Sequence, residues 1–577
     1  MNFLVDSLGC ILLRAITVFL TRLPAETALY LGKAIGVVGY YLDRQHRNIA
    51  YNNLKIAFGH EREPRHLRRI TKRLYQNFSQ NIVELLILPA MTPEYLRRYI
   101  SIEGEKYLRE ALDEKKGLIF LAVHFGSWEV SNVLGAMYGY HYKVIVKEQK
   151  RFQRLNELLT SYRQISGAFV VNKGRGTREI IDSLQQNEVV GLVADQGGKS
   201  GIFVDFFGRQ ASMSAGAIRI ALKLGVRVLP VFLIRKRGPY HILKINPPLD
   251  LKPTLDLEEN IKTNLTKVIS AAEEVIRQYP EQYMWFYKVW KYSQERTVTI
   301  LSDGKAGHLR QSEAVAKILE NQLREQNITP ATQTVEIRFK NQLAKLGLSL
   351  SGIFSADYLC HGCLRCLKYF LDRDSCANAW GVKSDFIISC GSNLAALNLL
   401  LSRETQAKRI CILKPGILSV KQFDAVIMPQ HDNPPLKKNV FITSGTPNSV
   451  DAPYLKEKQA ALLAKFPGLE SGRTKIGILI GGNTKKSILS QEAVGMLLDA
   501  VKEKSEAWDG EILVTTSRRT PAELENLVKT KFSAFPRCQL QIIANEKNIP
   551  EAVGGILALS KVLIVSEDSI SMISEAA

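Results

Sequence analysis

The chain contains 577 residues, more than one ordinary hydrophobic core organises, so we expect two or more domains. Hydrophobic residues make up 46% and charged residues 23% of the sequence, which is typical of a folded protein and excludes a disordered or low-complexity chain. The formal net charge of +21 predicts an anionic partner, such as anionic lipid headgroups, an acidic carrier protein or nucleic acid. No nucleic-acid motif is visible, so we expect no nucleic-acid partner.

Residues 1–45 predict helices that associate with a membrane. Residues 3–20 are mostly apolar but include Asp6 and Arg14, and the largely apolar segment 28–42 follows them. A membrane-spanning helix needs about 20 apolar residues with few charges. We therefore expect this pair of segments to lie in or dip into one leaflet as an anchor, with at most one marginal span.

A basic cluster follows the apolar segments. It consists of Arg62, Arg65, Arg68, Arg69, Lys72 and Arg73. Its position after the apolar N-terminus favours a membrane surface or an acidic carrier protein as the anionic partner. A solvated basic helix would give the same pattern.

Residues 46–295 predict an α/β domain. Short runs rich in Val, Ile and Leu are typical of buried strands, and they occupy residues 117–123, 142–146, 189–194 and 226–233. Helical stretches lie between and after these runs, at residues 151–167, 176–186 and 257–278. Since strands alternate with helices, we expect a mainly parallel sheet.

The most informative segment of this domain runs from His124 to Glu129. The apolar run before it places His124 at the exit of a strand and Glu129 one turn further on. A histidine there can take a proton from a substrate hydroxyl, and a nearby carboxylate can fix its tautomer and stabilise the imidazolium. A structural histidine would also fit, because the spacing arises by chance in many proteins. Gly126 and Trp128, between the two polar groups, favour a cleft.

Residues 296–577 predict a second α/β domain. Small residues follow its expected strands in the segments 302–308, 389–391, 481–483 and 566–569. Strand ends of this kind, gathered on one edge of a doubly wound sheet, would form a crevice for a nucleotide or a sugar phosphate.

Several residues of the second domain are candidates for such a ligand. They are Gly304, Gly307, Ser517, Arg518, Ser569 and Glu575. The glycines can present backbone N–H groups to an anion, and the last serine lies at a helix N-terminus that can hold a phosphate. The arginine can clamp a diphosphate, and the glutamate can bond ribose hydroxyls. Helix capping and surface arginines would explain the same residues.

Four cysteines of this domain are grouped. They are Cys360, Cys363, Cys366 and Cys376. Two successive two-residue gaps allow the thiolates to converge on zinc or on an iron–sulfur cluster. The alternative is an amphipathic helix with reduced, half-buried thiols.

Five ordered segments of the first half carry a family resemblance. They are residues 53–58, 124–129, 195–196, 203–208 and 280–285. With them, residues 5–291 resemble the bacterial lipid A biosynthesis acyltransferases. The resemblance implies an enzyme at the cytoplasmic face of the inner membrane that moves a fatty acyl chain from acyl carrier protein, or acyl-CoA, to a hydroxyl of lipid A or a related glycolipid. It also implies His124 as the general base, Glu129 as the residue that orients it, and no required cofactor.

The same resemblance implies further substrate-binding residues. They are Arg163, Asp195, Lys147, Phe207 and Gly208. The alternatives are a surface salt bridge at Arg163, a loop cap at Asp195 and ordinary apolar packing at Phe207. The chain departs from the family pattern after Trp285, because Tyr287 lies in a stretch that usually contains histidine and arginine.

The second half has its own set of motifs. They are residues 302–308 with Gln311, 430–432, 517–521 and 568–575. With them, residues 297–577 resemble the family named after a plant mitochondrial-fission protein, which is similar in pattern to GT-B glycosyltransferases. The resemblance implies a GT-B-like doubly wound α/β domain that is either a nucleotide-sugar-dependent glycosyltransferase or a ligand-binding regulatory module on the same lipid pathway. Because GT-B folds continue beyond the position of Glu575, we expect this domain to be C-terminally incomplete.

Overall fold

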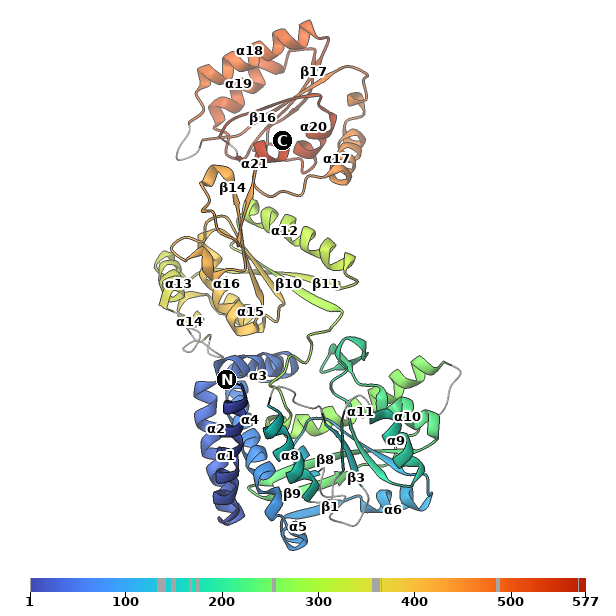
Figure 1. Ribbon diagram of the computed structural model, residues 1–577. Helices are drawn as coiled ribbons and strands as arrows, with labels where there is room; N and C mark the ends of the chain where they lie inside the picture. The colour runs from blue at the N-terminus through green and yellow to red at the C-terminus, as the bar shows by residue number, and fades with distance from the viewer. Residues whose placement is uncertain are drawn as a thin grey trace. The chain divides into compact units, whose positions relative to one another are not determined.

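The computed structural model describes residues 2–131, 142–146, 152–165, 169–172, 176–251, 256–354, 364, 366–483, 488–568 and 570–577. The chain divides into two compact units, of which the first contains the residues up to Arg296 and the second begins at Thr297. Both units are mixed α/β structures (Figure 1).

Four helices begin the first unit: α1 (Asn2–Thr21), α2 (Ala25–Leu42), α3 (Arg44–Phe58) and α4 (Pro64–Ile87). α2 packs closely against α4, since Gly32 and Gly36 have no side chain between the two helices (Figure 1). A Cβ at Gly36 would lie 2.5 Å from the carbonyl oxygen of Tyr75. These two glycines therefore allow the contact between the helices.

α1 and α2 leave many large apolar side chains exposed. They are Leu8, Ile11, Leu12, Ile16, Val18, Phe19, Tyr30, Ile35, Val38, Tyr41 and Leu42. No helix within the described part of the chain combines the length and the apolar character needed to cross a membrane.

The first unit is built on a seven-stranded sheet with the order β1-β9-β8-β2-β5-β3-β4. In that order the strands are Ile100–Glu103, Tyr240–Ile245, Arg227–Arg237, Leu118–Ala122, Val189–Val193, Tyr142–Val146 and Phe169–Asn172. All neighbouring strands pair in parallel except β8 and β9. The prediction of a mainly parallel sheet is confirmed.

Helices cover both faces of this sheet because successive side chains of a buried strand point to opposite faces. In β2, Ile119 and Leu121 join one apolar core, while Leu118 and Phe120 join the other. Further helices of this unit are α5 (Pro93–Tyr99), α6 (Glu105–Asp113), α8 (Gln153–Ile165), α9 (Gly176–Gln185), α10 (Gly216–Leu224) and α11 (Leu257–Gln278). A separate hairpin consists of β6 (Ile202–Phe206) and β7 (Arg209–Met213).

The second unit contains two sheets. The six-stranded sheet has the order β11-β10-β12-β13-β14-β15, with strands Thr329–Glu336, Glu295–Ser302, Phe386–Cys390, Lys408–Ile412, Ala425–Pro429 and Val440–Thr443. The four-stranded sheet has the order β18-β17-β16-β19, with strands Cys538–Ile542, Glu511–Thr516, Lys475–Ile480 and Val562–Val565. The helices are α12 (Ala306–Glu325), α13 (Gln342–Phe354), α14 (Leu367–Phe370), α15 (Arg373–Gly381), α16 (Ser392–Thr405), α17 (Ala452–Lys465), α18 (Gln491–Ala507), α19 (Ala522–Phe532), α20 (Ala552–Leu559) and α21 (Ile570–Ala576).

This division corrects the expectation of one shared sheet edge in the second unit. The strands before segments 302–308 and 389–391 belong to the six-stranded sheet, whereas those before 481–483 and 566–569 belong to the four-stranded sheet. Apolar runs specify strands, but they do not specify which strands pair, and therefore the sequence pattern merged two sheets into one.

Candidate active site

His124 lies two residues beyond the end of β2, in a tight loop that leads to the helical residues 128–131. Gly126 has φ +60°, and a side chain there would collide with the carbonyl oxygen of Leu233, so the loop requires glycine. Two backbone hydrogen bonds hold the loop: Gly126 N–H donates to the Gln282 carbonyl at 2.9 Å, and Met284 N–H donates to the His124 carbonyl at 2.9 Å.

Asp195 orients the imidazole of His124. It follows β5, the neighbour of β2, and the carboxyl ends of parallel strands meet at one edge of a sheet. Nδ1 of His124 lies 2.8 Å from Oδ1 of Asp195, and the backbone N–H of His124 donates to Oδ2 at 3.1 Å. With Nδ1–H donating to the carboxylate, the lone pair of the neutral ring lies on Nε2. The Asp195 side chain is 1% exposed and that of His124 is 23% exposed, so only the histidine is accessible to a substrate.

The pair shifts both pKa values toward the charged forms. Burial opposes a positive charge on His124, but the charge of Asp195, its hydrogen bond and the more distant Glu129 together raise the pKa of His124 above 6.5. Burial likewise opposes ionisation of Asp195, and its contacts with His124 outweigh this, so the pKa of Asp195 is lowered. The imidazolium that a general base forms is thus stabilised in place.

Two tyrosines, the buried Tyr283 and the half-buried Tyr287, complete the environment of Asp195. The hydroxyl of Tyr287 donates to the Asp195 carbonyl at 3.0 Å and lies 3.3 Å from Oδ2, and the Tyr283 hydroxyl is 2.6 Å from that of Tyr287. Asn53 fixes this segment, because its side-chain amide donates to the carbonyls of Trp285 and Tyr287 at 2.8 and 2.6 Å. Tyr287, which departs from the family pattern, therefore contacts the residue that orients His124.

Glu129 forms a bidentate ion pair with Arg163 of α8 and makes no hydrogen bond to His124. Nε and Nη2 of Arg163 donate to Oε2 and Oε1 of Glu129, both at 2.7 Å. Both side chains are largely buried, so Arg163 is not in a surface salt bridge. The expected orienting role of Glu129 belongs by geometry to Asp195, because Arg163 occupies both Glu129 oxygens.

Aromatic side chains lie beside the histidine. Trp128 meets the His124 ring edge to face with centroids 5.8 Å apart, and Phe78 of α4 lies 6.2 Å from Trp128. Phe286 extends this group, at 5.0 Å from Phe78. An exposed imidazole edge flanked by apolar rings suits a substrate with both a hydroxyl and an acyl chain.

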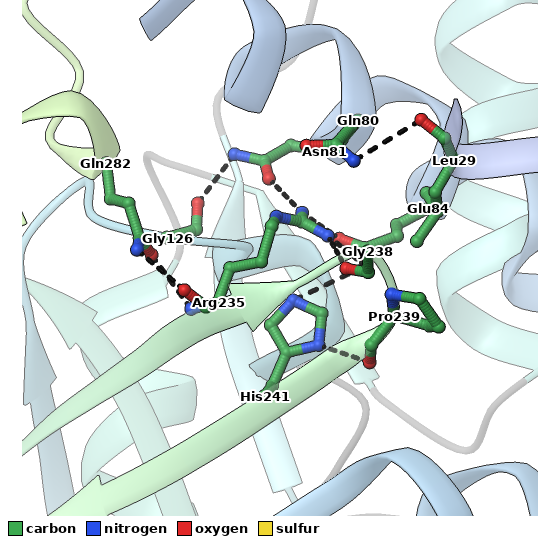
Figure 2. A network of polar contacts seen from close by, with 10 residues as sticks. All are labelled: Leu29, Gln80, Asn81, Glu84, Gly126, Arg235, Gly238, Pro239, His241 and Gln282. Atoms are coloured by element: carbon green, nitrogen blue, oxygen red, sulfur yellow. Dashed lines mark hydrogen bonds and ion pairs between the residues drawn. The ribbon is translucent and has the colours of Figure 1, made fainter. Parts of the chain in front are cut away.

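A buried polar network supports the loop from behind (Figure 2). Arg235 of β8 donates to both oxygens of Glu84 at 2.8 and 2.6 Å, and to Oδ1 of Asn81 at 2.6 Å. Asn81 in turn donates to the Gly126 carbonyl at 2.6 Å (Figure 2). His241 lies 3.4 Å from Glu84, and burial lowers the pKa of His241 to about 4. The network thus connects the interior of the unit to the loop that carries His124.

Residues 2–292 match the model of the bacterial lipid A biosynthesis acyltransferase family. The chain belongs to this family. It is similar to the lipid A biosynthesis lauroyltransferase of Escherichia coli, with 23% identity over 274 residues that cover 47% of this chain and 87% of that enzyme. The lipid A biosynthesis palmitoleoyltransferase of the same organism is 25% identical over 279 residues, again 47% of this chain and 87% of the relative.

A different lipid class appears among the relatives. The phosphatidylinositol mannoside acyltransferase of Mycolicibacterium smegmatis is 28% identical over 153 residues, which cover 26% of this chain and 50% of that protein. As a member of the family the chain is an acyltransferase. Residues 306–577 match a second family model, described as mitochondrial fission ELM1.

The other residues expected to bind the acyltransferase substrate lie elsewhere. Phe207 and Gly208 form the turn of the β6–β7 hairpin, with φ values of +55° and +76°. Phe207 is buried and packs against Phe58 and Trp285, which corresponds to the apolar-packing alternative. Lys147 lies outside the described residues.

The candidate ligand residues of the second unit are divided between its two sheets. Gly304 lies in the loop after β10 and Gly307 in the first turn of α12, whereas Ser517 and Arg518 follow β17. Glu575 lies in α21, where burial raises its pKa, and Ser569 lies outside the described residues. These residues therefore do not belong to one strand edge.

A pocket of about 380 Å³ lies in the second unit where β10, β12, β13 and β14 end. Its lining consists of Lys305, His308, Gly391, Ser392, Asn393, Leu413, Lys414 and Asp432. His308 pairs with Asp303 at 3.1 Å, and Asp303 also contacts Asn393 and Lys305, each at 3.3 Å. The pocket combines two lysines with the N-terminus of α16, so it suits an anionic ligand.

The proposed metal site at the cysteines receives no support. Among the described residues, no group of three or more His, Cys, Asp or Glu side chains is arranged to hold a metal ion. Cys376 is buried in α15, and Cys366 is half-buried before α14, while Cys360 and Cys363 lie outside the described residues.

Residue-level reasoning missed three contributors to the site: Tyr287, Asn53 and Asn81. All three act through hydrogen bonds between segments that are distant along the chain. Asn53 lies in a segment that carries the family resemblance, which was the one available signal for it.

Proposed function

We propose that the first unit transfers a fatty acyl chain from acyl carrier protein, or acyl-CoA, to a hydroxyl of lipid A or a related glycolipid, with His124 as general base. The observation that carries the proposal is the His124–Asp195 pair, which leaves Nε2 of an exposed imidazole edge free to accept a proton. Membership of the acyltransferase family supports the reaction class.

The residues support the following sequence of steps. Nε2 of His124 takes the proton from the acceptor hydroxyl as its oxygen attacks the thioester carbonyl carbon. The tetrahedral intermediate collapses, the new ester forms, and the carbon–sulfur bond breaks. The departing thiolate takes the proton back from the imidazolium, which Asp195 stabilises between the two transfers.

The Glu129–Arg163 pair serves a different purpose in this proposal. Its charges are matched and largely buried, so it fixes the helical residues after the loop to α8. Glu129 still favours the imidazolium through its charge, which contributes to the raised pKa of His124. Glu129 acts as a positioning residue.

We also propose that α1 and α2 hold the protein at the cytoplasmic face of the inner membrane. Their exposed apolar side chains suit the interface of one leaflet. The exposed basic side chains of α4, among them Arg68, Arg69 and Arg73, suit the anionic headgroups of that surface or an acidic carrier protein.

The test is acyl transfer by the full-length protein from radiolabelled acyl carrier protein to lipid A-type glycolipids and to extracted membrane lipids. His124→Ala is expected to reduce the rate by about a thousandfold, the usual range for a general base. His66→Ala, which removes an exposed histidine of α4, is the matched control and should retain the wild-type rate. Wild-type activity in His124→Ala would refute the proposed base.

The second unit has its own candidate function, favoured by the pocket at the strand ends. It is binding of a nucleotide sugar, either for glycosyl transfer or for regulation on the same lipid pathway. Calorimetry of the full-length protein with UDP- and CMP-sugars tests binding, and a Lys305→Gln/Lys414→Gln variant tests the pocket. Detectable sugar transfer would distinguish an enzyme from a regulatory module, and no heat with any of these sugars would reject both.

A further inference from the structure

A second polar cleft lies in the first unit, between α2, α4 and the turn that joins β8 to β9. Its volume is about 410 Å³, and it is open to solvent. The side chains that give it its character are Lys33, Arg73, Gln76, Asn77, Lys236 and Arg237. It is distinct from the loop that carries His124.

The cleft has an excess of unneutralised positive charge. Lys33, Arg73, Lys236 and Arg237 are exposed, and no ion pair joins any of the four to a carboxylate among the described residues. Lys236 donates to the hydroxyl of Tyr279 at 2.8 Å, which leaves its charge unmatched. These cations therefore favour an anion in the cleft.

The acidic residues near the cleft do not cancel this charge. Glu26 and Glu281 are the only carboxylates among the residues that line the cleft in the described part of the chain. Glu26 already accepts a hydrogen bond from Tyr99 at 2.8 Å. The floor is polar and internally paired, because the charge of Arg235 is matched by Glu84 (Figure 2). The cleft thus has four exposed cations above a neutral floor, and amide donors from α4 lie beside them. Such an arrangement is suited to hold a phosphate.

An apolar surface adjoins the cleft. Tyr30 lines it and is 69% exposed, and Tyr41, about three helical turns further along the same face of α2, is 60% exposed. A lipid can thus place its phosphate among the cations while its acyl chains contact these exposed side chains of α2. We propose that this cleft binds the phosphate of a lipid headgroup.

The cleft is connected to the catalytic loop through α4 and Gln282. Asn77 lines the cleft, and its neighbour Phe78 packs against Trp128 beside His124. Gln282 also lines the cleft, and its carbonyl accepts the hydrogen bond from Gly126. The phosphate belongs either to the glycolipid acceptor, an assignment that rests on the proposed function, or to an anionic phospholipid of the surrounding membrane.

Short-chain lipids that stay monomeric test the cleft without the field of a membrane surface. The full-length protein is titrated by calorimetry with dihexanoyl phosphatidylglycerol below its micelle concentration. We expect saturable binding that Arg73→Gln/Arg237→Gln weakens by about tenfold, as loss of charge-assisted hydrogen bonds implies. Arg178→Gln/Arg219→Gln removes the same charge from exposed positions on α9 and α10 that do not line the cleft, and it should bind as the wild type does.

Circular dichroism and thermal melting verify that both variants fold. Equal weakening in the two variants, or none in either, would overturn the proposal, since binding would then depend on general surface charge or on another site. Inorganic phosphate serves as the competitor: competition as strong as that of the lipid would show a site for free phosphate and would also refute it. The proposal would also be refuted if Arg73→Gln/Arg237→Gln bound the lipid as the wild type does but had a raised KM for acyl carrier protein. The cleft would then be a docking surface for the carrier protein.

Kinetics then identify the source of the phosphate. A raised KM for the glycolipid acceptor in Arg73→Gln/Arg237→Gln assigns the cleft to the acceptor. Lost binding of the short-chain lipid with an unchanged acceptor KM assigns it to phospholipid. Because binding is measured without acyl transfer, failure of the catalytic proposal would leave this test intact.

Discussion

The two units each contain a histidine paired with an aspartate near the ends of parallel strands, and the pairs differ in instructive ways. His124 lies 2.8 Å from Asp195, and His308 lies 3.1 Å from Asp303. The histidine side chains are 23% and 24% exposed, and both aspartates are buried. Distance and burial alone would therefore assign both pairs the same chemistry.

The difference lies in what else the carboxylate contacts. Asp195 comes from the neighbouring strand and directs both oxygens to His124, with tyrosine hydroxyls as its other partners. Asp303 lies in the short loop before α12, the helix that carries His308, and also contacts Lys305 and Asn393. A carboxylate shared with a lysine stabilises an imidazolium less, so a histidine–aspartate pair indicates a general base only when the carboxylate is not shared with another cation.

Exchange of each aspartate for asparagine tests the difference between the two pairs with the largest expected effect. Asp195→Asn is expected to lower kcat/KM for acyl transfer by about a thousandfold, because the amide can favour the wrong tautomer and cannot stabilise the imidazolium. Asp303→Asn should leave acyl transfer unchanged. Radiolabelled transfer assays on both variants measure this, and equal losses would show that the two pairs are not functionally distinct.

The next largest effect is expected on stability, from the buried network around Arg235 that supports the His124 loop. Arg235→Met leaves Glu84 buried and uncompensated, which costs about 3–5 kcal/mol of unfolding free energy. Arg65→Met, which removes an exposed pair with Glu63, should cost less than about 1 kcal/mol. Chemical denaturation, followed in the transition of the first unit, compares them, and similar costs would contradict a supporting role for the network.

The pH dependence of acyl transfer tests whether Asp195 sets the pKa of His124. A base acts when neutral, and the raised pKa of His124 keeps it protonated to higher pH, so kcat/KM should rise with pH through a midpoint above 6.5. Asp195→Asn removes the main cause of the raised pKa, and the midpoint of its residual activity should move to lower pH. A midpoint unaffected by this exchange would show that another group titrates.

Tyr287→Phe is expected to have the smallest effect. It removes one hydrogen bond to Asp195, worth about 1 kcal/mol, so kcat/KM should fall by about fivefold. Tyr240→Phe, on the far strand β9, is the control and should retain full activity. A loss as large as that of Asp195→Asn would mean that the tyrosine takes part in the chemistry directly.

The sequence predicted four adjacent strands of the first sheet, and the contacts between strand ends only in part. Apolar runs located β2, β3, β5 and β8, since a strand buried on both faces is continuously apolar. They placed His124 and Asp195 after two such strands. Closeness along the chain and the family resemblance both indicated Glu129 as the partner of His124. In the structure Arg163 contacts Glu129 from another helix.

Pairing between strands was the other part that local patterns did not specify. The antiparallel β8–β9 hairpin and the division of the second unit into two sheets both depend on which strands meet. Tyr287 shows the same limit at the level of one residue. Its hydroxyl matters because Asn53 holds its segment beside Asp195, and no local pattern encodes that approach.

The hydrogen bond from Met284 to the His124 carbonyl has a consequence for the order of folding. The loop is bridged by residues 282–284, and Tyr287 reaches Asp195 from the same terminal segment of the first unit. During synthesis, His124 therefore leaves the ribosome long before residues 282–287, which hold its loop in place. Because domains fold as units once their long-range contacts can form, the His124 loop is assembled only when the whole first unit has left the ribosome.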